Sequence, residues 1–461
     1  MVRLYMVYGK TKEQPGLTSK QLRQKFLAFF ADKKHVSVPS SSLTNSGDPS
    51  VLLTTAGMQQ FKPYLMGKAD PVKIFKSKNV FTIQKCFRTT DIDEVGDNSH
   101  LTFFEMVGNF SFGGYFKETA IPTSFEFITS PKGLNLNPEK LYVTAFKGDD
   151  QVPRDDEAIR LWQAQFNKVG INAKIGERIF LYGREKNWWE AGPGPCGPDA
   201  EMFFDLGKPH NVRFGPTCHP NCDCGRFIEI GNDVFVQYNK TADNRYEPLT
   251  HKGIDNGRGF ERLVMVAQGK ESIFETDLFL PLIRIVDSAK TRHGLPKELE
   301  GKASRIITDH MRGATFLMAE GLAPSNVKAG YVLRRVLRRA IRFAHTLDLP
   351  YEVFNQLIKT TASMYVDAYP ELRKNLSFIQ QTFQKEYQVF GKTLKKGMAA
   401  FEKTISSTKN DVFPGQQAFF LFSSYGFPLE LIEEMLKERQ MTLEQQGFAE
   451  ALALHREKSR P

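Results

Sequence analysis

Apolar residues follow two different patterns along this chain. Between residues 36 and 262 they occur in short runs separated by Gly, Pro and Asp turns, which predicts β-strands. After Phe260 they recur every three or four residues almost without interruption, which predicts helices. Strand runs with few intervening helices favour an antiparallel sheet in an α+β domain over a doubly wound sheet. We therefore predict a sheet domain flanked by helices at residues 1–268 and an all-helical domain at residues 269–461.

One helix is predicted before the strands, from Thr18 or Ser19 to about Lys34, because a hydroxyl can cap its first turn. Its apolar face contains Leu22, Phe26, Phe29 and Phe30. The predicted strands occupy residues 73–87, 100–110, 141–146, 201–206, 227–238 and 252–255. The predicted helices of the second domain occupy residues 276–293, 304–320, 329–347 and 372–405.

Length, composition and charge indicate the number of domains, the class of partner and the location of the protein. At 461 residues, with 41% apolar and 25% charged residues, the chain is long enough for two or three globular domains. Its net charge of +10 indicates a polyanionic partner such as nucleic acid, although many basic proteins bind none. We see no signal peptide and no apolar run that could span a membrane, so we expect a cytoplasmic protein.

The segment IDNGRGFER at residues 254–262 combines a strand end, two glycines and the start of a helix. Gly257 and Gly259 let the backbone approach a ligand, and Arg262 projects from a helix start that favours anions. Asp255 at the strand end suits an ammonium group. The alternative is an ordinary strand-to-helix turn with a solvated charge pair.

A second element starts with KCFR at residues 85–88, continues through a polar loop and ends with HLTFFEM at residues 100–106. Arg88 at the end of one strand could bind a phosphate, and the aromatic residues Phe103 and Phe104 on the other could stack on adenine. His100 lies at the start of the second strand. The alternative is a simple hairpin with a packed Phe pair.

In this order, the two elements match the second and third signature motifs of class II aminoacyl-tRNA synthetases. Within that class, the chain closely resembles the alanyl-tRNA synthetases from about residue 19 to residue 457. The segments that carry this resemblance are TAGMQQFK at 55–62, FFEMVGNFSFG at 103–113, GPCGP at 194–198 and PSN at 324–326.

The resemblance implies an enzyme that activates L-alanine with ATP and Mg²⁺ and passes it to the acceptor stem of tRNA(Ala). It assigns Arg88 to the α-phosphate, Arg262 to the γ-phosphate and Asp255 to the α-amino group, so these three are the expected catalytic residues. The implied ATP-binding residues are Arg88, His100, Phe103, Phe104, Glu229 and Arg262, with Glu229 as a candidate ligand of Mg²⁺. The implied alanine-binding residues are Trp189, Asn232, Val234, Asp255 and Gly257.

Three of the five cysteines lie within residues 218–224. Cys218, His219, Cys222 and Cys224 could supply four ligands to a tetrahedral Zn²⁺, and His210 lies eight residues upstream. The spacing is tighter than in most zinc fingers. The alternative is a loop of reduced thiols without a metal.

The segment YVLRRVLRRAIR at residues 331–342 places Arg334, Arg338 and Arg342 on one helical face. A predicted buried stripe of Leu333, Leu337, Ile341 and Ala344 would present these arginines outward to the RNA backbone. The alternative is a solvated basic face. The predicted tRNA-binding residues are Asn326, Arg334, Arg335, Arg338, Arg339, Arg342 and Ser423.

Ser423 marks a departure from the family. Most alanyl-tRNA synthetases read a G·U pair in the acceptor stem with an Asn, which maps to Asn326, and with an Asp in a Leu-Tyr-Asp-x-Tyr-Gly pattern. Here that pattern reads LFSSYG at residues 421–426, with Ser423 in place of the acid. A hydroxyl lacks the charge that strengthens a hydrogen bond from a base amino group, so we predict weakened dependence on the G·U pair.

The chain ends at Pro461, before the editing and carboxy-terminal domains that usually follow in the family. An alanine pocket cannot strongly exclude serine, so we expect this chain alone, which we predict to be monomeric, to form measurable seryl-tRNA. Two other hypotheses remain: a paralogue that binds tRNA without charging it, and a ligase that delivers the adenylate to another acceptor.

Overall fold

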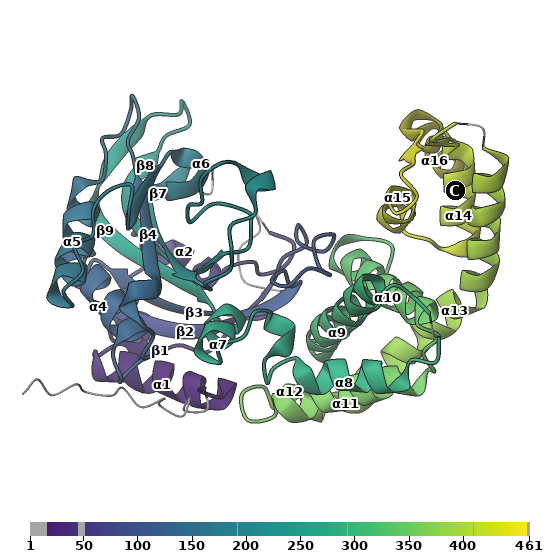
Figure 1. Ribbon diagram of the computed structural model, residues 1–461, viewed down its shortest axis with the longest axis horizontal. Helices are drawn as coiled ribbons and strands as arrows, with labels where there is room; N and C mark the ends of the chain where they lie inside the picture. The colour runs from purple at the N-terminus through teal and green to yellow at the C-terminus, as the bar shows by residue number, and fades with distance from the viewer. Residues whose placement is uncertain (1–15, 45–50, 191, 293, 409, 459–461) are drawn as a thin grey trace, which may run out of the picture. The chain divides into compact units, whose positions relative to one another are not determined.

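The computed structural model describes residues 16–44, 51–190, 192–292, 294–408 and 410–458 (Figure 1). The chain forms two compact units that interleave along the sequence. The first unit comprises Met1–Val38, Phe61–Thr82 and Val107–Asp277, and the second comprises Pro39–Gln60, Ile83–Met106 and Leu278–Pro461. These units reflect packing, and the division into functional domains at residues 268 and 269 stays a prediction.

Among the described residues, nine strands form one mixed sheet in the order β1-β2-β3-β9-β8-β7-β4-β5, with β6 paired to β7. Strands β7, β8 and β9 pair antiparallel, whereas β1 pairs with β2 and β4 with β5 in parallel. The predicted α+β class is confirmed. The strands are β1 Val36–Ser37, β2 Asn79–Phe87, β3 Phe103–Phe112, β4 Leu141–Phe146, β5 Ile179–Tyr182, β6 Trp188–Glu190, β7 Gly194–Asp205, β8 Phe227–Lys240 and β9 Tyr246–Gly259.

Helix α4 (Lys117–Thr129) covers one face of the sheet at β8 and β9. Asp233 of β8 and Arg258 of β9 form a fully buried ion pair with a nitrogen–oxygen distance of 3.2 Å. Ser124 of α4 donates to Asp233 at 2.9 Å and accepts from Arg258 at 2.6 Å. Because side chains alternate along a strand, the residues next to Asp233 and Arg258 point to the opposite face.

The predicted first helix is confirmed as α1 (Ser19–Asp32), with Thr18 and Gln21 forming a capping box. Its predicted apolar face is buried. The predicted strand at residues 73–87 is wrong at its start, because α3 (Pro71–Phe75) occupies that position and β2 begins at Asn79. The Asp70 side chain caps α3, and proline at its first position is already fixed near the helical φ angle.

The second unit confirms the predicted helices, although α8 is shorter than the predicted range 276–293, whose last residue lies outside the described residues. The last predicted helix is split into α12 and α13. Its hydrophobic core includes the predicted stripe of Leu333, Leu337, Ile341 and Ala344. No helix in the described part of the chain is long and apolar enough to cross a bilayer. The helices are α8 Leu280–Ala289, α9 Lys297–Ala319, α10 Lys328–Thr346, α11 Glu352–Met364, α12 Glu371–Lys374, α13 Leu376–Ser407, α14 Gly415–Tyr425, α15 Leu429–Lys437 and α16 Gln445–Lys458.

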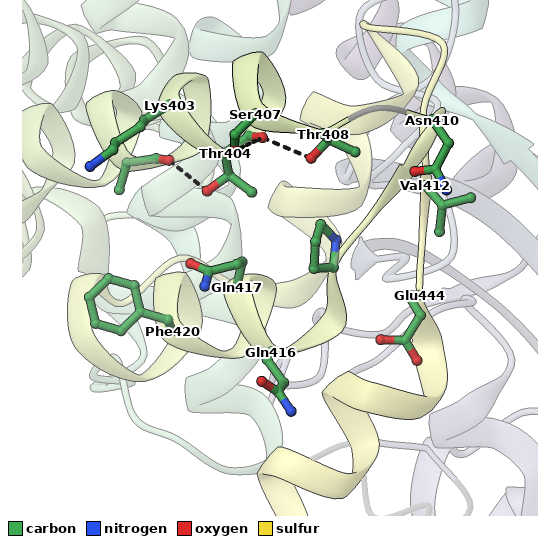
Figure 2. Close-up of a pocket in the computed structure, with 12 residues that line it drawn as sticks. Lys403, Thr404, Ser407, Thr408, Asn410, Val412, Gln416, Gln417, Phe420 and Glu444 are labelled. Atoms are coloured by element: carbon green, nitrogen blue, oxygen red, sulfur yellow. Dashed lines mark hydrogen bonds between the residues drawn. The ribbon is translucent and has the colours of Figure 1, made fainter.

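A pocket of about 870 Å³ lies in the second unit beside the end of α13 and the start of α14 (Figure 2). Hydroxyl and amide groups dominate its wall, for example Thr404, Ser407, Gln416 and Gln417, with Phe420 at one side. None of the predicted site residues lines this pocket, so it is separate from the candidate functional site.

Candidate functional site

Four of the predicted alanine-binding residues lie at paired positions on β8 and β9. Asn232 pairs with Gly257, and Val234 pairs with Asp255. Residues two apart on a strand share a face, and directly paired residues share it too. These four residues therefore lie together on the sheet face opposite helix α4.

Asp255 is a buried carboxylate without a partner in the described chain. Its residue is 6% exposed, and burial raises its pKa to about 7. The buried Asn232 Oδ1 atom also has no hydrogen-bond partner among the described residues. An unsatisfied buried acceptor is costly, so two of them on one face indicate a ligand that donates hydrogen bonds.

Two further acids, Asp199 and Glu201 of β7, belong to this face. Asp199 pairs with Val234 and Glu201 pairs with Asn232. Burial raises the pKa of Asp199 to about 7, and burial together with the charge of Glu229 raises the pKa of Glu201 to about 8. Neither residue is among the site residues that the sequence predicts. Their signal is the spacing of two acids at alternate positions in the middle of a buried strand.

Arg262 lies in the first turn of helix α7 (Phe260–Ala267), which begins directly after β9. The predicted change from strand to helix is confirmed. The Arg262 guanidinium donates to the Glu229 carboxylate at 3.0 Å and to the Glu229 carbonyl oxygen at 3.2 Å. Both side chains are about one-third exposed, so the pair remains accessible to an anion or a metal ion.

Trp189 lies in the short strand β6, where it pairs with Gly197 of β7. Gly197 is two residues from Asp199, the residue that pairs with Val234. The first unit therefore contains all five predicted alanine-binding residues, together with Glu229 and Arg262, on strands β6, β8 and β9 and on helix α7, with β7 between β6 and β8.

The second unit contains the other predicted ATP-binding residues. Arg88 follows β2 directly, and its guanidinium carbon lies 4.9 Å from the centre of the Phe104 ring. The Arg88 Nε atom donates to the Thr55 carbonyl oxygen at 3.3 Å, and the backbone NH of Arg88 donates to the Thr102 carbonyl oxygen at 2.9 Å. These contacts hold the Arg88 guanidinium next to the Phe104 ring. A cation beside an aromatic ring is the arrangement expected for binding a phosphate and stacking an adenine.

Phe103 does not share this arrangement. Its ring is fully buried and stacks on Phe316 of α9 with a centroid distance of 4.0 Å, and Arg312 covers it at 4.8 Å. The prediction that Phe103 contacts a nucleotide is therefore wrong, because this face of β3 packs against the helical core. His100 is partly exposed, and its Nδ1 atom lies 2.6 Å from the Asp97 carboxylate.

The arginine helix α10 differs from the prediction. Arg338, Arg339 and Arg342 are at most 8% exposed, so they do not face outward. Their guanidinium groups form ion pairs with acids of α13 and α15 or the residue that follows α15. The partners are Glu386 for Arg338 at 2.6 Å, Glu434 for Arg339 at 2.7 Å and Glu438 for Arg342 at 2.9 Å.

The remaining predicted tRNA-binding residues are more accessible. Asn326 and Ser423 are exposed, and Ser423 lies in helix α14. Arg334 donates to the Asn326 side chain, and Arg335 pairs with Asp93 at 2.7 Å. The exposed part of the predicted set is therefore Asn326 and Ser423, with Arg334 and Arg335 partly exposed.

The Cys and His residues between β7 and β8 form a cluster, but with a different histidine from the predicted one. Ligand atoms of His210, Cys218, Cys222 and Cys224 all lie within 4.8 Å of one another. His219 is outside this group, because its Nδ1 atom lies 2.8 Å from the Tyr182 hydroxyl of β5. His210 takes its place, although it is further away in the sequence.

Comparison with known proteins assigns the chain to a family. The family model described as tRNA synthetases class II (A) matches residues 21–461. The alanine–tRNA ligase of Treponema pallidum is 44% identical over 95% of this chain and 72% of its own length. The enzymes of the same name from Borreliella afzelii and Rubrobacter xylanophilus are 40% and 41% identical over 96% of this chain, and over 73% and 50% of their own lengths.

The sheet, the site residues and these matches define a class II tRNA synthetase. Within that class, the chain belongs to the family of the alanine–tRNA ligases.

Proposed function

We propose that this chain activates L-alanine with ATP and transfers it to tRNA(Ala). The observation that carries this proposal is the buried face formed by Asp255, Asn232 and Val234, where acceptors without a partner surround a small apolar surface. A small amino acid offers the complementary groups, namely an ammonium group and a methyl group.

In the first step, the alanine carboxylate attacks the α-phosphorus of ATP, pyrophosphate leaves and alanyl-adenylate forms. Asp255 accepts hydrogen bonds from the α-ammonium group, and Val234 contacts the methyl group. Arg88 neutralises the α-phosphate, and the Phe104 ring holds the Arg88 side chain or the adenine in place. No side chain needs to remove a proton, because the carboxylate is already ionised at neutral pH.

In this proposal, Arg262 binds the pyrophosphate end of ATP. Glu229 holds the Arg262 guanidinium at 3.0 Å, so the side chain is positioned before the nucleotide binds. Glu229 and the neighbouring Glu201 offer hard oxygen donors that fit Mg²⁺, and their mutual repulsion favours a cation. Mg²⁺ would neutralise phosphate charge as pyrophosphate leaves.

In the second step, the 3′-terminal hydroxyl of tRNA attacks the adenylate carbonyl and AMP leaves. We assign acceptor-stem recognition to the exposed residues Asn326 and Ser423, with Arg334 oriented by its bond to Asn326. Arg338, Arg339 and Arg342 are assigned to the framework of the helical unit, because their charges are already paired.

A paired assay tests the proposal and separates it from its alternatives. We expect alanine-dependent exchange of labelled pyrophosphate into ATP and charging of tRNA(Ala) with alanine by the same preparation. Exchange without charging would indicate a ligase with another acceptor. Neither activity, together with retained tRNA binding, would indicate a paralogue that only binds tRNA.

Three further expectations from the sequence concern properties other than catalysis and tRNA recognition, and they remain predictions. They are the cytoplasmic location, the monomeric state and the binding of Zn²⁺, which concerns the cluster at residues 210–224 and is independent of the proposed activity.

A further inference from the structure

The connection between β7 and β8 is long for a link between antiparallel neighbours. It runs from Leu206 to Arg226, and its described regular structure is the single turn Val212–Phe214. Val212 is 75% exposed and Phe214 is 50% exposed, so these apolar side chains do not form a core. Loops of this length inside a compact unit are uncommon unless they are functional or disordered. Something other than hydrophobic burial must therefore order this loop.

The base of the loop is closed by an ion pair. Arg226 donates to both oxygens of the Asp205 carboxylate, at 3.1 Å from Nε and 2.7 Å from Nη2. Such two-point contacts are among the stronger ion pairs. The pair holds the two strand ends together, but it does not reach the outer part of the loop.

The outer part gathers the four donor atoms described above. The Cys218 and Cys224 sulfurs are 3.6 Å apart, and the Cys222 sulfur is 3.8 Å from His210 Nδ1. A disulfide bond would require about 2.05 Å, so these thiols are free. Bond lengths of about 2.3 Å for Zn–S and 2.0–2.1 Å for Zn–N give tetrahedral edges of roughly 3.5–3.8 Å. Each separation lies within about 0.3 Å of the edge expected for its pair of atoms.

The orientation of His210 supports the same conclusion. Its Nε2 atom lies 2.8 Å from the Gly215 carbonyl oxygen. A carbonyl oxygen can only accept, so Nε2 carries the proton and Nδ1 presents its lone pair to the three sulfurs. Histidines that bind metals usually donate their other nitrogen to a carbonyl or carboxylate in this way.

We propose that this chain binds one structural Zn²⁺ ion through His210 Nδ1 and the sulfurs of Cys218, Cys222 and Cys224. Three thiolates and one imidazole fill a tetrahedral site, which leaves no open position for a substrate or a water molecule. The ion cross-links the two arms of the loop between β7 and β8. These strands carry Glu201, Glu229 and Asn232, so the site would also anchor the loop next to the candidate alanine pocket.

The test is the metal content of the full chain, purified without chelator. Elemental mass spectrometry should find about one zinc ion per chain. Cys218→Ser, Cys222→Ser and His210→Ala should each lower the zinc content to below about 0.1 ion per chain. His219→Ala is the matched control, because His219 is in the same loop but bonds Tyr182. It should retain full zinc. Circular dichroism confirms that each variant is folded.

Cobalt substitution supplies a second readout on the unmodified sequence, so the result does not depend on any variant folding. The Co²⁺-loaded chain should show strong visible d–d bands of a tetrahedral site and near-ultraviolet thiolate-to-cobalt bands. Wild-type chain without zinc and without these bands would overturn the proposal. Zinc loss in His219→Ala but not in His210→Ala would overturn the ligand set. Pyrophosphate exchange is measured separately, so a failure of the zinc proposal is distinct from a failure of the proposed activity.

Discussion

Val234 on β8 lies directly opposite Asp255 on β9, so a methyl-bearing side chain and a buried carboxylate face the same space on the sheet. Asp255 is 6% exposed, whereas a free carboxylate normally remains in water. The uncompensated burial of this acid is the kind of unfavourable local arrangement that persists at functional sites.

Asp255→Asn should raise the KM for alanine by roughly 10- to 100-fold, because a hydrogen bond between charged groups contributes about 1.5–3 kcal/mol. The KM for ATP should change little. Pyrophosphate exchange at varied alanine concentration measures both values. Glu247→Gln, an exposed acid on the same strand β9, is the control and should behave as wild type. An unchanged KM for alanine in Asp255→Asn would remove Asp255 from the pocket.

The sequence was sufficient to predict elements whose signal is local. Helix α1 has a capping box and a regular apolar face, and α10 has a periodic stripe of Leu333, Leu337 and Ile341 that is buried as expected. The motif at residues 254–262 predicted the change from strand to helix, which is confirmed, and the roles of Asp255 and Arg262 stay predictions. These properties depend on residues a few positions apart.

Features that depend on distant partners could not be predicted in the same way. The period of α10 shows which residues share a face, but not that Glu386, Glu434 and Glu438 pack against that face. Similarly, spacing alone favoured His219 over His210, because the fold of the loop brings the distant histidine to the thiols. Phe103 and Phe104 are adjacent and chemically identical, so only the packing of Phe316 distinguishes their roles.

Asp199→Asn should reduce the pH dependence of stability. Burial raises the pKa of folded Asp199 to about 7 from its ordinary value of 3.8, so the folded state binds the proton more tightly than the unfolded state. The resulting stabilisation is complete below about pH 4 and is lost as the pH rises to about 7. When the pH is raised from 5 to 8, the free energy of unfolding of the wild type should fall by about 2–3 kcal/mol more than that of Asp199→Asn.

Urea denaturation at both pH values measures this difference. Asp150→Asn changes an exposed acid and should leave the wild-type pH dependence intact. Equal losses in wild type and Asp199→Asn would show that Asp199 titrates normally.

Arg338→Ala should destabilise the helical unit by about 3 kcal/mol, because it leaves the buried Glu386 carboxylate with only the longer ion pair to Arg334, at 3.3 Å. Arg335→Ala is the matched control on the same helix. Its partner Asp93 is 61% exposed, so the loss should be below about 1 kcal/mol. Replacing both members of the buried pair, as Arg338→Met with Glu386→Leu, should recover most of the loss. Denaturant unfolding measures all three, and equal effects of Arg338→Ala and Arg335→Ala would contradict a framework role.

Ser423→Asp should increase the dependence on the acceptor-stem G·U pair. Ser423 is exposed on α14, and its hydroxyl accepts a hydrogen bond more weakly than a carboxylate. The wild type should therefore lose less than about 10-fold in charging rate when G·U is replaced by G·C, and Ser423→Asp should lose roughly 10-fold more than the wild type. Ser424→Asp adds the same charge at the next exposed position of the helix, so it separates geometry from net charge. A large loss with G·C in the wild type would mean that Ser423, or another residue, already reads the pair as strongly as an acid.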